Sequence, residues 1–544
     1  MNSGSSKILA IMMVIALLAA MLHFSLSGSL SIQDGKLIRE DSLTAREQIQ
    51  DTEKDKTGPL ILWYTDESLT DYLMSISLAY QGYSGTKVSP VLVSGVEYLE
   101  QINAASINDQ DAPDLYITSN DNLMKAYLAG LATKIEDPDK VVIPQNYPQT
   151  ALHAVGCDGE LVAYPFYYET NFFLYNKTFM ADLAKQTIET EADQAAAEEA
   201  MAALEAEGEP TTQAKEITTP ETQDQADGAA DDTAEDTTVD TAADSGEEAG
   251  SDETGMDEES YGLSAEVLQQ MSTMIPSTID DILAFADNYD APETVEYVFK
   301  WDVSDIFYNY FFVGNYIDVG GEDGDNNANF NIFNQETIDC LQVYQDLNQF
   351  FSIDTKEVTY DKILQEFIEG KTVFTVATTD AIAKIEEAKA AGNFSYEYGV
   401  AVLPDLSSKL KARGLSVTNA VAINGYSGRK EDANAFAEYL TYTDLDTLYN
   451  RSGKIACRYD VEYDNPEISN TMLEYQKSVS LPKMIEASNF WVQLEIAFTK
   501  VWTGSDPEEE LRALSELIGS QIDEIGYTIP TQESISAGAD EAVK

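Results

Sequence analysis

The chain has 544 residues, of which 96 are acidic and 32 are basic, so its formal net charge is −64. Such a charge excludes nucleic-acid binding, because phosphate recognition needs a basic surface, and it disfavours docking on an anionic membrane. Hydrophobic residues make up 44% of the chain, which is enough for a buried core. The length suggests three to four domains of about 150 residues each.

The cysteine and histidine content narrows the possible chemistry. Cys157, Cys340 and Cys457 are widely spaced, so neither a disulfide scaffold nor a cysteine-based zinc site is predicted. One of the two histidines, His23, lies in an N-terminal apolar segment, which leaves His153 for the folded body. A single histidine excludes a multi-histidine metal site and disfavours a Ser-His-Asp triad. We therefore expect neither a metal nor a cofactor.

An apolar run near the N-terminus predicts export. Residues 8–22 are apolar without interruption and follow Lys7, which is typical of a secretory leader or a membrane anchor. Lys7 on the short side favours an N-terminus inside and the bulk of the chain outside. We expect a signal peptide or anchor over residues 1–27 and a polar stalk over residues 28–57, and the sequence leaves open whether the leader is cleaved.

Residues 186–260 carry 25 acidic residues, one basic residue (Lys215) and no aromatic residue. The Ala- and Glu-rich part over residues 181–207 favours a helix. From residue 208 onward, Pro, Thr, Asp and Gly dominate, and few apolar groups are available to offset the entropy of ordering. We predict a disordered acidic insert over 186–260, and limited proteolysis should cut first within 208–260.

The first folded block predicts an α/β architecture. Its opening run PLILWYT, bounded by Gly58 and Asp66, is typical of a buried strand. Strands alternate with helices from there on, over residues 59–65, 69–81, 87–93, 96–107, 112–117 and 122–130. This alternation predicts a parallel sheet with helical crossovers, and ligands of such folds bind at the carboxyl ends of the strands.

Several stretches, in the same order along the chain, resemble a known family. The most specific is GELVAYP at residues 159–165, followed by LYNK at residues 174–177. The others are residues 61–67, 112–131, 277–286, 320–334, 367–375, 398–404, 420–440 and 481–491. Together they resemble bacterial extracellular solute-binding proteins of ABC importers, specifically the maltodextrin-binding group.

The resemblance implies an α/β, two-lobed periplasmic-binding-protein-like fold of type II with three hinge crossings. The crossings fall near residues 164–168, 411–416 and 454–458. By the same resemblance, lobe 1 comprises residues 58–165 with 414–455, and lobe 2 comprises 166–413 with 456–530. The acidic insert then belongs to lobe 2, and residues 531–544 form a tail.

A saccharide site needs aromatic faces against the apolar side of sugar rings and carboxylates that accept hydrogen bonds from hydroxyls. Residues of both kinds occur at positions that match the family's cleft. The resemblance implies these ligand-binding residues: Glu67, Asp121, Tyr168, Glu169, Phe307, Tyr308, Tyr310 and Trp491.

Other positions depart from the family pattern. Ser68 stands where the family usually has a Lys, and Asn122 and Glu495 stand where it usually has an Arg. Thr118 stands where a Trp is usual, and Asp380 stands near a position that a Trp usually occupies. Two stacking surfaces and cationic hydrogen-bond donors are therefore missing. We expect a ligand other than simple maltose and a more acidic cleft that disfavours anionic solutes.

Structural roles compete with binding for several of these residues. Trp491 could pack in the core, Asp121 could cap the helix that starts at Asn122, and Glu67 could cap the helix after Ser68. Of Tyr308 and Tyr310, one could pack in the core while the other lines the cleft. Glu169 could be a surface or hinge acid.

The leading hypothesis is a monomeric binding subunit that captures a neutral saccharide by hinge closure and delivers it to ABC permease subunits. A second hypothesis is a degenerate paralogue that acts as a surface sensor or structural protein, which the missing Lys, Arg and Trp keep open. A third is a glycoside-acting enzyme with Glu169 and Asp121 as its acid pair.

Overall fold

The computed structural model describes residues 30–33, 36–39, 58–108, 111–137, 139–207, 263–485 and 489–522. The predicted leader, most of the predicted stalk, the acidic segment beyond residue 207 and the C-terminal tail lie outside these residues. Within the predicted stalk, β1 (Leu30–Gln33) pairs antiparallel with β2 (Lys36–Arg39). No helix among the described residues is long and apolar enough to cross a bilayer.

The chain divides into two compact units, and residues 179–275 form the smaller one. It contains most of α7 (Lys177–Glu207) and all of α8 (Ala265–Met274), whose N-cap Ser264 accepts a hydrogen bond from the Val267 N–H. The helix predicted over residues 181–207 is thus present within α7. The described part of the predicted disordered insert, residues 186–207, is helical, because runs of Ala and Glu have high helix propensity.

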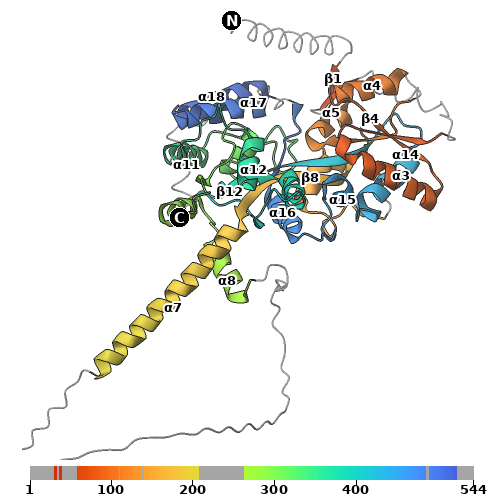
Figure 1. Cartoon of the computed structure of the whole chain (residues 1–544). Helices are drawn as coiled ribbons and strands as arrows, with labels where there is room; N and C mark the ends of the chain where they lie inside the picture. Colours follow the sequence, from red (N-terminus) through yellow and green to blue (C-terminus); the bar gives the residue numbers. More distant parts are fainter. Residues whose placement is uncertain are drawn as a thin grey trace, which may run out of the picture. The chain divides into compact units, whose positions relative to one another are not determined.

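The larger unit begins with the predicted alternation of strands and helices (Figure 1). The order is β3 (Leu60–Tyr64), α3 (Thr70–Ser84), β4 (Val88–Leu92), α4 (Tyr98–Asn108), β5 (Leu115–Ser119) and α5 (Leu123–Leu128). β3 lies between β4 and β5 and is parallel to both, so the predicted parallel sheet is confirmed. We call the part built on β3–β5 the first lobe.

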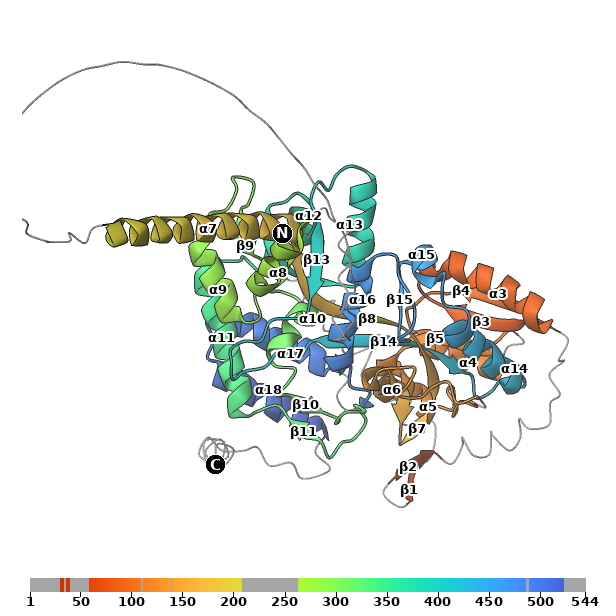
Figure 2. The same cartoon turned by 90° about the horizontal axis from the view of Figure 1, so that it is seen from below.

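The longest strand, β8 (Ala163–Asn176), connects this lobe to the rest of the unit (Figure 2). Its first part pairs with β14 (Leu415–Ile423), which also pairs with β5. Its second part pairs with β12 (Thr372–Thr378) and β13 (Tyr398–Ala401). β9 (Tyr297–Phe299) is parallel to β12. We call the part built on β9, β12 and β13 the second lobe.

Helices cover both lobes, and several of them begin at a side-chain cap. In α9, for example, Thr278 and Asp281 form a capping box. The remaining helices are α6 (Gln149–Val155), α9 (Ile279–Asn288), α10 (Ile306–Asn309), α11 (Gln335–Phe351), α12 (Tyr360–Ile368), α13 (Asp380–Ala390), α14 (Lys430–Glu438), α15 (Leu448–Ser452), α16 (Pro466–Lys477), α17 (Phe490–Trp502) and α18 (Pro507–Ile522). Short strands complete the unit: β6 (Gly156–Cys157), β7 (Glu160–Leu161), β10 (Asp318–Val319), β11 (Phe330–Asn331), β15 (Ile455–Ala456) and β16 (Val479–Ser480).

Each lobe has its own apolar core. In the first lobe, Leu62 and Tyr72 pack with Phe436 of α14. In the second, Phe172 packs with residues of α12, α13 and α16 such as Phe367. All three cysteines are free and buried. Cys157 packs in the first lobe, Cys340 in α11 of the second, and Cys457 next to β8.

The three segments predicted as hinge crossings meet at the middle of β8. Ser416, the last residue of the second segment, pairs with Thr170 of β8, and Ile455 of the third segment pairs with Tyr168, the last residue of the first. The β8–β14 register shifts at Asn419, which leaves Phe166 outside the ladder, and the Phe166 carbonyl accepts a hydrogen bond from the Cys457 N–H instead. A bulge of this kind bends a strand locally. The structure thus joins the three segments by hydrogen bonds, and their action as a hinge stays a prediction.

Candidate functional site

A cavity of about 210 Å³ lies where β3 and β5 end, which is the edge at which parallel sheets bind ligands. Thr65 and Asp66 come directly after β3, and Ser119 and Asn122 lie at the end of β5. The other lining residues are Leu69, Gly95, Tyr98, Ile117, Thr118, Tyr167 and Asn419. Hydroxyl, amide and carboxylate groups thus surround a small apolar floor.

Asp66 is the N-cap of the short helix that follows β3. Its Oδ1 accepts hydrogen bonds from the Ser68 N–H at 3.0 Å and the Ser68 hydroxyl at 2.7 Å. This capping fixes the side chain so that the second oxygen, Oδ2, is available for another partner. These hydrogen bonds thus define the conformation of the loop over residues 65–68 where it borders the cavity.

The partner of Asp66 comes from the segment next to β15. Lys454 Nζ lies 2.7 Å from Asp66 Oδ2 and 3.3 Å from Glu169 Oε1. It also lies 5.2 Å from the centre of the Tyr167 ring, within reach of a cation–π interaction. Of the 14 residues of β8, Glu169 alone is not buried. Lys454 thus links the first lobe's loop to the strand that connects both lobes.

The contacts within this trio shift the pKa values of Asp66 and Lys454. Burial alone raises the pKa of Asp66, but the hydrogen bonds from Lys454 and Ser68 outweigh it and hold that pKa below its usual value. Burial alone lowers the pKa of Lys454, but the negative charges of Glu169 and Asp66 outweigh it and raise that pKa. Both groups are therefore charged at neutral pH.

A second cavity, of about 660 Å³, lies between the lobes beside the same segment. One wall comes from the first lobe and consists of Ser68, Asp446 and residues 449–453. The other wall comes from the second lobe and consists of Ala383, Glu386, residues 462–465 and Ile468. Four of the lining residues are acidic and one, Arg451, is basic. The loop over residues 65–68 contributes to both cavities.

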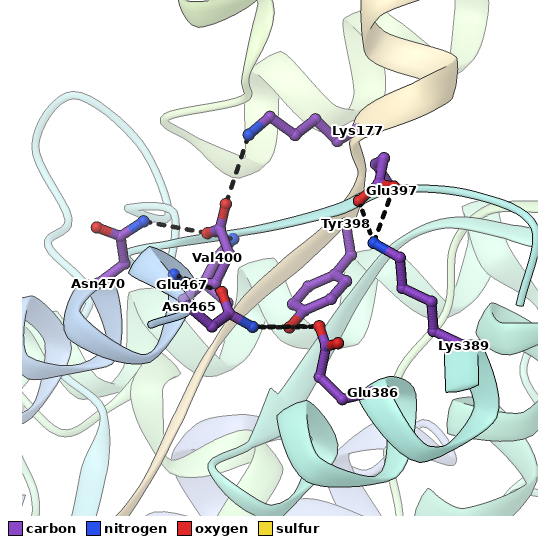
Figure 3. Close-up of polar contacts among 9 residues, drawn as sticks. All are labelled: Lys177, Glu386, Lys389, Glu397, Tyr398, Val400, Asn465, Glu467 and Asn470. Atoms are coloured by element: carbon purple, nitrogen blue, oxygen red, sulfur yellow. Dashed lines mark hydrogen bonds and ion pairs between the residues drawn. The ribbon is translucent and has the colours of Figure 1, made fainter. Parts of the chain in front are cut away.

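Hydrogen bonds hold the second-lobe wall of this larger cavity (Figure 3). Glu386 Oε1 accepts from the Tyr398 hydroxyl at 2.7 Å and from Asn465 Nδ2 at 3.1 Å. Asn465 also caps α16, because its Oδ1 accepts from the Glu467 N–H. Behind it, Glu467 Oε2 accepts from the Val400 N–H at 2.7 Å. Groups held in this way are pre-organised for a ligand and cost little to order on binding.

The predicted aromatic residues Phe307, Tyr308, Tyr310 and Trp491 contact other rings in the second lobe. Trp491 packs edge-on against Tyr310, with ring centres 5.2 Å apart. Tyr308 stacks on Tyr360, with ring centres 4.8 Å apart. Trp491 and Phe307 are half-buried, whereas Tyr308 and Tyr310 are buried. Trp491 and Phe307 therefore retain ring surface for a ligand, and the two tyrosines support them.

The three predicted acids have different surroundings. Glu169 contacts Lys454, as described above. Glu67 is exposed and does not cap the helix after β3, because Asp66 does. Asp121 Oδ1 accepts from the Ser119 hydroxyl at 2.5 Å and caps no backbone N–H among its described contacts. Ser119 and Asn122 around it line the small cavity, so Asp121 lies at its border.

Tyr168, which was predicted to contact the ligand, is instead fully buried. Its ring stacks on Tyr475 and its hydroxyl lies 2.7 Å from the Thr471 hydroxyl. The prediction failed because β8 is covered on both faces. Side chains on either face of this strand are therefore buried, instead of alternating between core and cleft. The neighbouring Tyr167 lines the small cavity in its place.

Sequence reasoning missed Asp66 and Lys454 as site residues. Asp66 stood next to the predicted Glu67, and a one-residue difference in a capped loop decides which acid contacts the cavity. Lys454 was noted as the start of a crossing segment. A basic residue in so acidic a chain is a signal that would have indicated a charged partner nearby.

The comparisons with known proteins agree with this geometry. Residues 253–444 match the family described as "Bacterial extracellular solute-binding protein". No curated protein matches the chain significantly. The predicted resemblance to sugar-binding extracellular solute-binding proteins and the predicted two-lobed fold are thus confirmed.

Three solved structures of this fold are similar to the chain. An extracellular solute-binding protein from Staphylococcus aureus in complex with maltose has 19% identity and a TM-score of 0.61, and the match covers 87% of this chain and all of the other. A cyclo/maltodextrin-binding protein with maltotetraose has 16% identity and a TM-score of 0.60, with 87% and 100% covered. The maltose-binding periplasmic protein MalE from Listeria monocytogenes, with maltose, has 17% identity and a TM-score of 0.59, with 86% and 99% covered.

Proposed function

We propose that this chain, which has the fold of the bacterial extracellular solute-binding proteins, captures a neutral saccharide between its lobes and delivers it to an ABC importer. The observation that carries the proposal is the position of the Asp66–Lys454–Glu169 trio. Asp66 lines the cavity at the strand ends, Lys454 pairs with it, and Glu169 lies on the strand that connects both lobes. The larger cavity beside this trio has one wall from each lobe, so a ligand there contacts both lobes.

The chemistry of the two cavities suits polyhydroxylated rings. Carboxylates and amides accept and donate hydrogen bonds to hydroxyls, and charged groups make the stronger bonds. Trp491 is not among the residues that line either cavity, and its half-buried ring supplies a further face for the apolar side of a sugar. Four carboxylates line the larger cavity, and this charge disfavours anionic solutes.

The mechanism we propose is hinge closure. A ligand that contacts both lobes has more contacts in the closed form, so it shifts the population toward that form. The bulge at Phe166 bends β8 between the two packed cores, and this supports a hinge at that point. The chain acts outside the cytoplasm as a binding protein, not as an enzyme, and the relatives of the same fold are named as binding proteins.

A thermal-shift screen tests this function. The purified protein is melted with a panel of neutral mono- and oligosaccharides that includes maltose and maltotetraose, and with sugar acids as controls. Ligands that bind the native state alone raise the melting temperature. We expect at least one neutral saccharide to do so and no sugar acid, and small-angle scattering should then show a decrease in the radius of gyration. A panel without any stabilising saccharide would refute the function.

A further inference from the structure

Lys454 occupies an unusual place among the charged groups of the cleft. Its side chain is 20% exposed, whereas those of Asp66 and Glu169 are 32% and 41% exposed. A lysine ammonium has three N–H donors, and these two carboxylates engage two of them. Among the described residues, no carboxylate other than these two lies within ion-pair distance of Lys454. Lys454 therefore has one donor to offer to a ligand beside the small cavity.

The positive charge of Lys454 is surrounded mainly by carboxylates. The small cavity is bordered by the carboxylates of Asp66 and Asp121, and the larger one is lined by Glu386, Asp446, Glu462 and Asp464. Among the described residues that line the two cavities, Arg451 alone is basic, and it pairs with Asp71 outside the lining. Without Lys454, Asp66 and Glu169 would face each other as like charges and would attract a cation.

We propose that Lys454 contacts the ligand and sets the charge specificity of the cleft. Its ammonium offsets one of the two negative charges of Asp66 and Glu169, so that this part of the cleft accepts an uncharged hydroxyl and attracts a cationic group less than it would without the lysine. Its remaining N–H donates to that hydroxyl. The inference rests on the proposed function and adds to it a residue and a ligand class: uncharged sugars in preference to amino sugars.

Four variants separate this role from a structural one. Lys454→Met removes the charge and keeps most of the volume, and Lys454→Arg keeps the charge. The double variant Ser68→Lys/Lys454→Met moves the ammonium to a position that already contacts Asp66, since the Ser68 hydroxyl donates to Asp66 Oδ1. Lys371→Met is the matched control, because Lys371 also lies between two carboxylates, Glu296 and Glu369, before β12.

The probes are the neutral oligosaccharide with the largest shift in the screen and its analogue with an amino group in place of one hydroxyl. Calorimetric titration should show that Lys454→Met weakens binding of the neutral sugar by about tenfold or more, which is the size of one charge-assisted hydrogen bond. The same variant should bind the amino sugar more tightly than the wild type does. Lys454→Arg and the double variant should recover neutral-sugar binding, and Lys371→Met should leave both affinities unchanged.

The outcomes of these titrations test the assignment of Lys454 separately from the proposed function. If Lys454→Met binds the neutral sugar as the wild type does, or loses both sugars equally, the assignment is wrong and the proposed function stands. If the single variant does not fold, the double variant and Lys454→Arg carry the test, and failure of both to bind while folded overturns the assignment. If the wild type binds no saccharide of the panel, the function and the inference fall together.

Discussion

The rings of Tyr168 and Tyr475 stack face to face, with centres 4.0 Å apart and planes 4° from parallel. Tyr168 belongs to β8 and Tyr475 to α16, so the stack fixes the helix beneath the point where the three crossing segments meet. The Tyr475 hydroxyl also lies 2.6 Å from the Thr418 hydroxyl of β14. One buried tyrosine pair thus links β8, at the first predicted crossing segment, to α16 and β14.

Truncating this pair should destabilise the protein without changing ligand contacts. Tyr168→Ala should lower the free energy of unfolding by about 3–5 kcal/mol, as for other large buried aromatics. Tyr475→Phe, which keeps the stack and loses the hydroxyl, should cost about 1 kcal/mol. Urea unfolding measures both. A Tyr168→Ala protein of wild-type stability with weakened saccharide binding would restore Tyr168 to the ligand site.

Trp491 and Phe490 form a natural pair for testing the aromatic surface. Trp491 is half-buried and Phe490 fully buried at the start of α17. Trp491→Ala should weaken saccharide binding by roughly 10- to 100-fold and change the unliganded melting temperature little, because about 1.4 kcal/mol is a tenfold change. Phe490→Ala should cost about 3–5 kcal/mol of stability. Unfolding of the Trp491 variant with normal binding by the remaining folded protein would show that Trp491 is core.

The depressed pKa of Asp66 predicts a specific pH dependence. Because the folded-state pKa lies below the ordinary value of about 4, the ionised carboxylate favours the folded state above that pH. The stabilisation is lost as the pH falls through the depressed pKa. Asp66→Asn, which still caps the helix, should therefore lower stability at neutral pH, and the difference from wild type should shrink below about pH 4. Urea unfolding across this range measures it, and a constant difference at all pH values would contradict it.

Position 414, directly before β14, leaves no space for a side chain larger than that of glycine. A Cβ there would lie 2.5 Å from Asn171 Oδ1 and 2.9 Å from Glu474 Oε1, and both side chains are buried. Gly414→Ala should therefore cost about 1–3 kcal/mol through overpacking. The control is Gly82→Ala in α3, where nothing lies within 4 Å, and it should stabilise the protein by about 0.5–1 kcal/mol. Thermal melts of both variants test the opposite signs, and equal effects would contradict the packing argument.

Local patterns were enough to predict the first lobe, because each element is bounded by its own signals. The run over residues 59–65 is apolar and flanked by Gly58 and Asp66, and it became β3. Lys454 could not be predicted as a site residue, because its contact with Asp66 joins residues almost 400 positions apart and depends on the pairing of β15 with β8. The prediction for Tyr168 failed for a related reason. Because β8 is buried on both faces, its side chains do not alternate between buried and exposed, and that alternation is what assigns a side chain to core or cleft from sequence.

The three buried cysteines can report on local unfolding in different parts of the protein. Burial raises the pKa of Cys157 to about 11 and that of Cys457 to about 12, and it raises the pKa of Cys340 as well. The thiols are thus protonated and shielded in the folded protein, and they react with alkylating reagents mainly when their surroundings open. Cys157 reports on the first lobe, Cys340 on the second, and Cys457 on the junction at β8. Pulse alkylation followed by peptide mass mapping can therefore time the loosening of each region in the natural chain, with no engineered label.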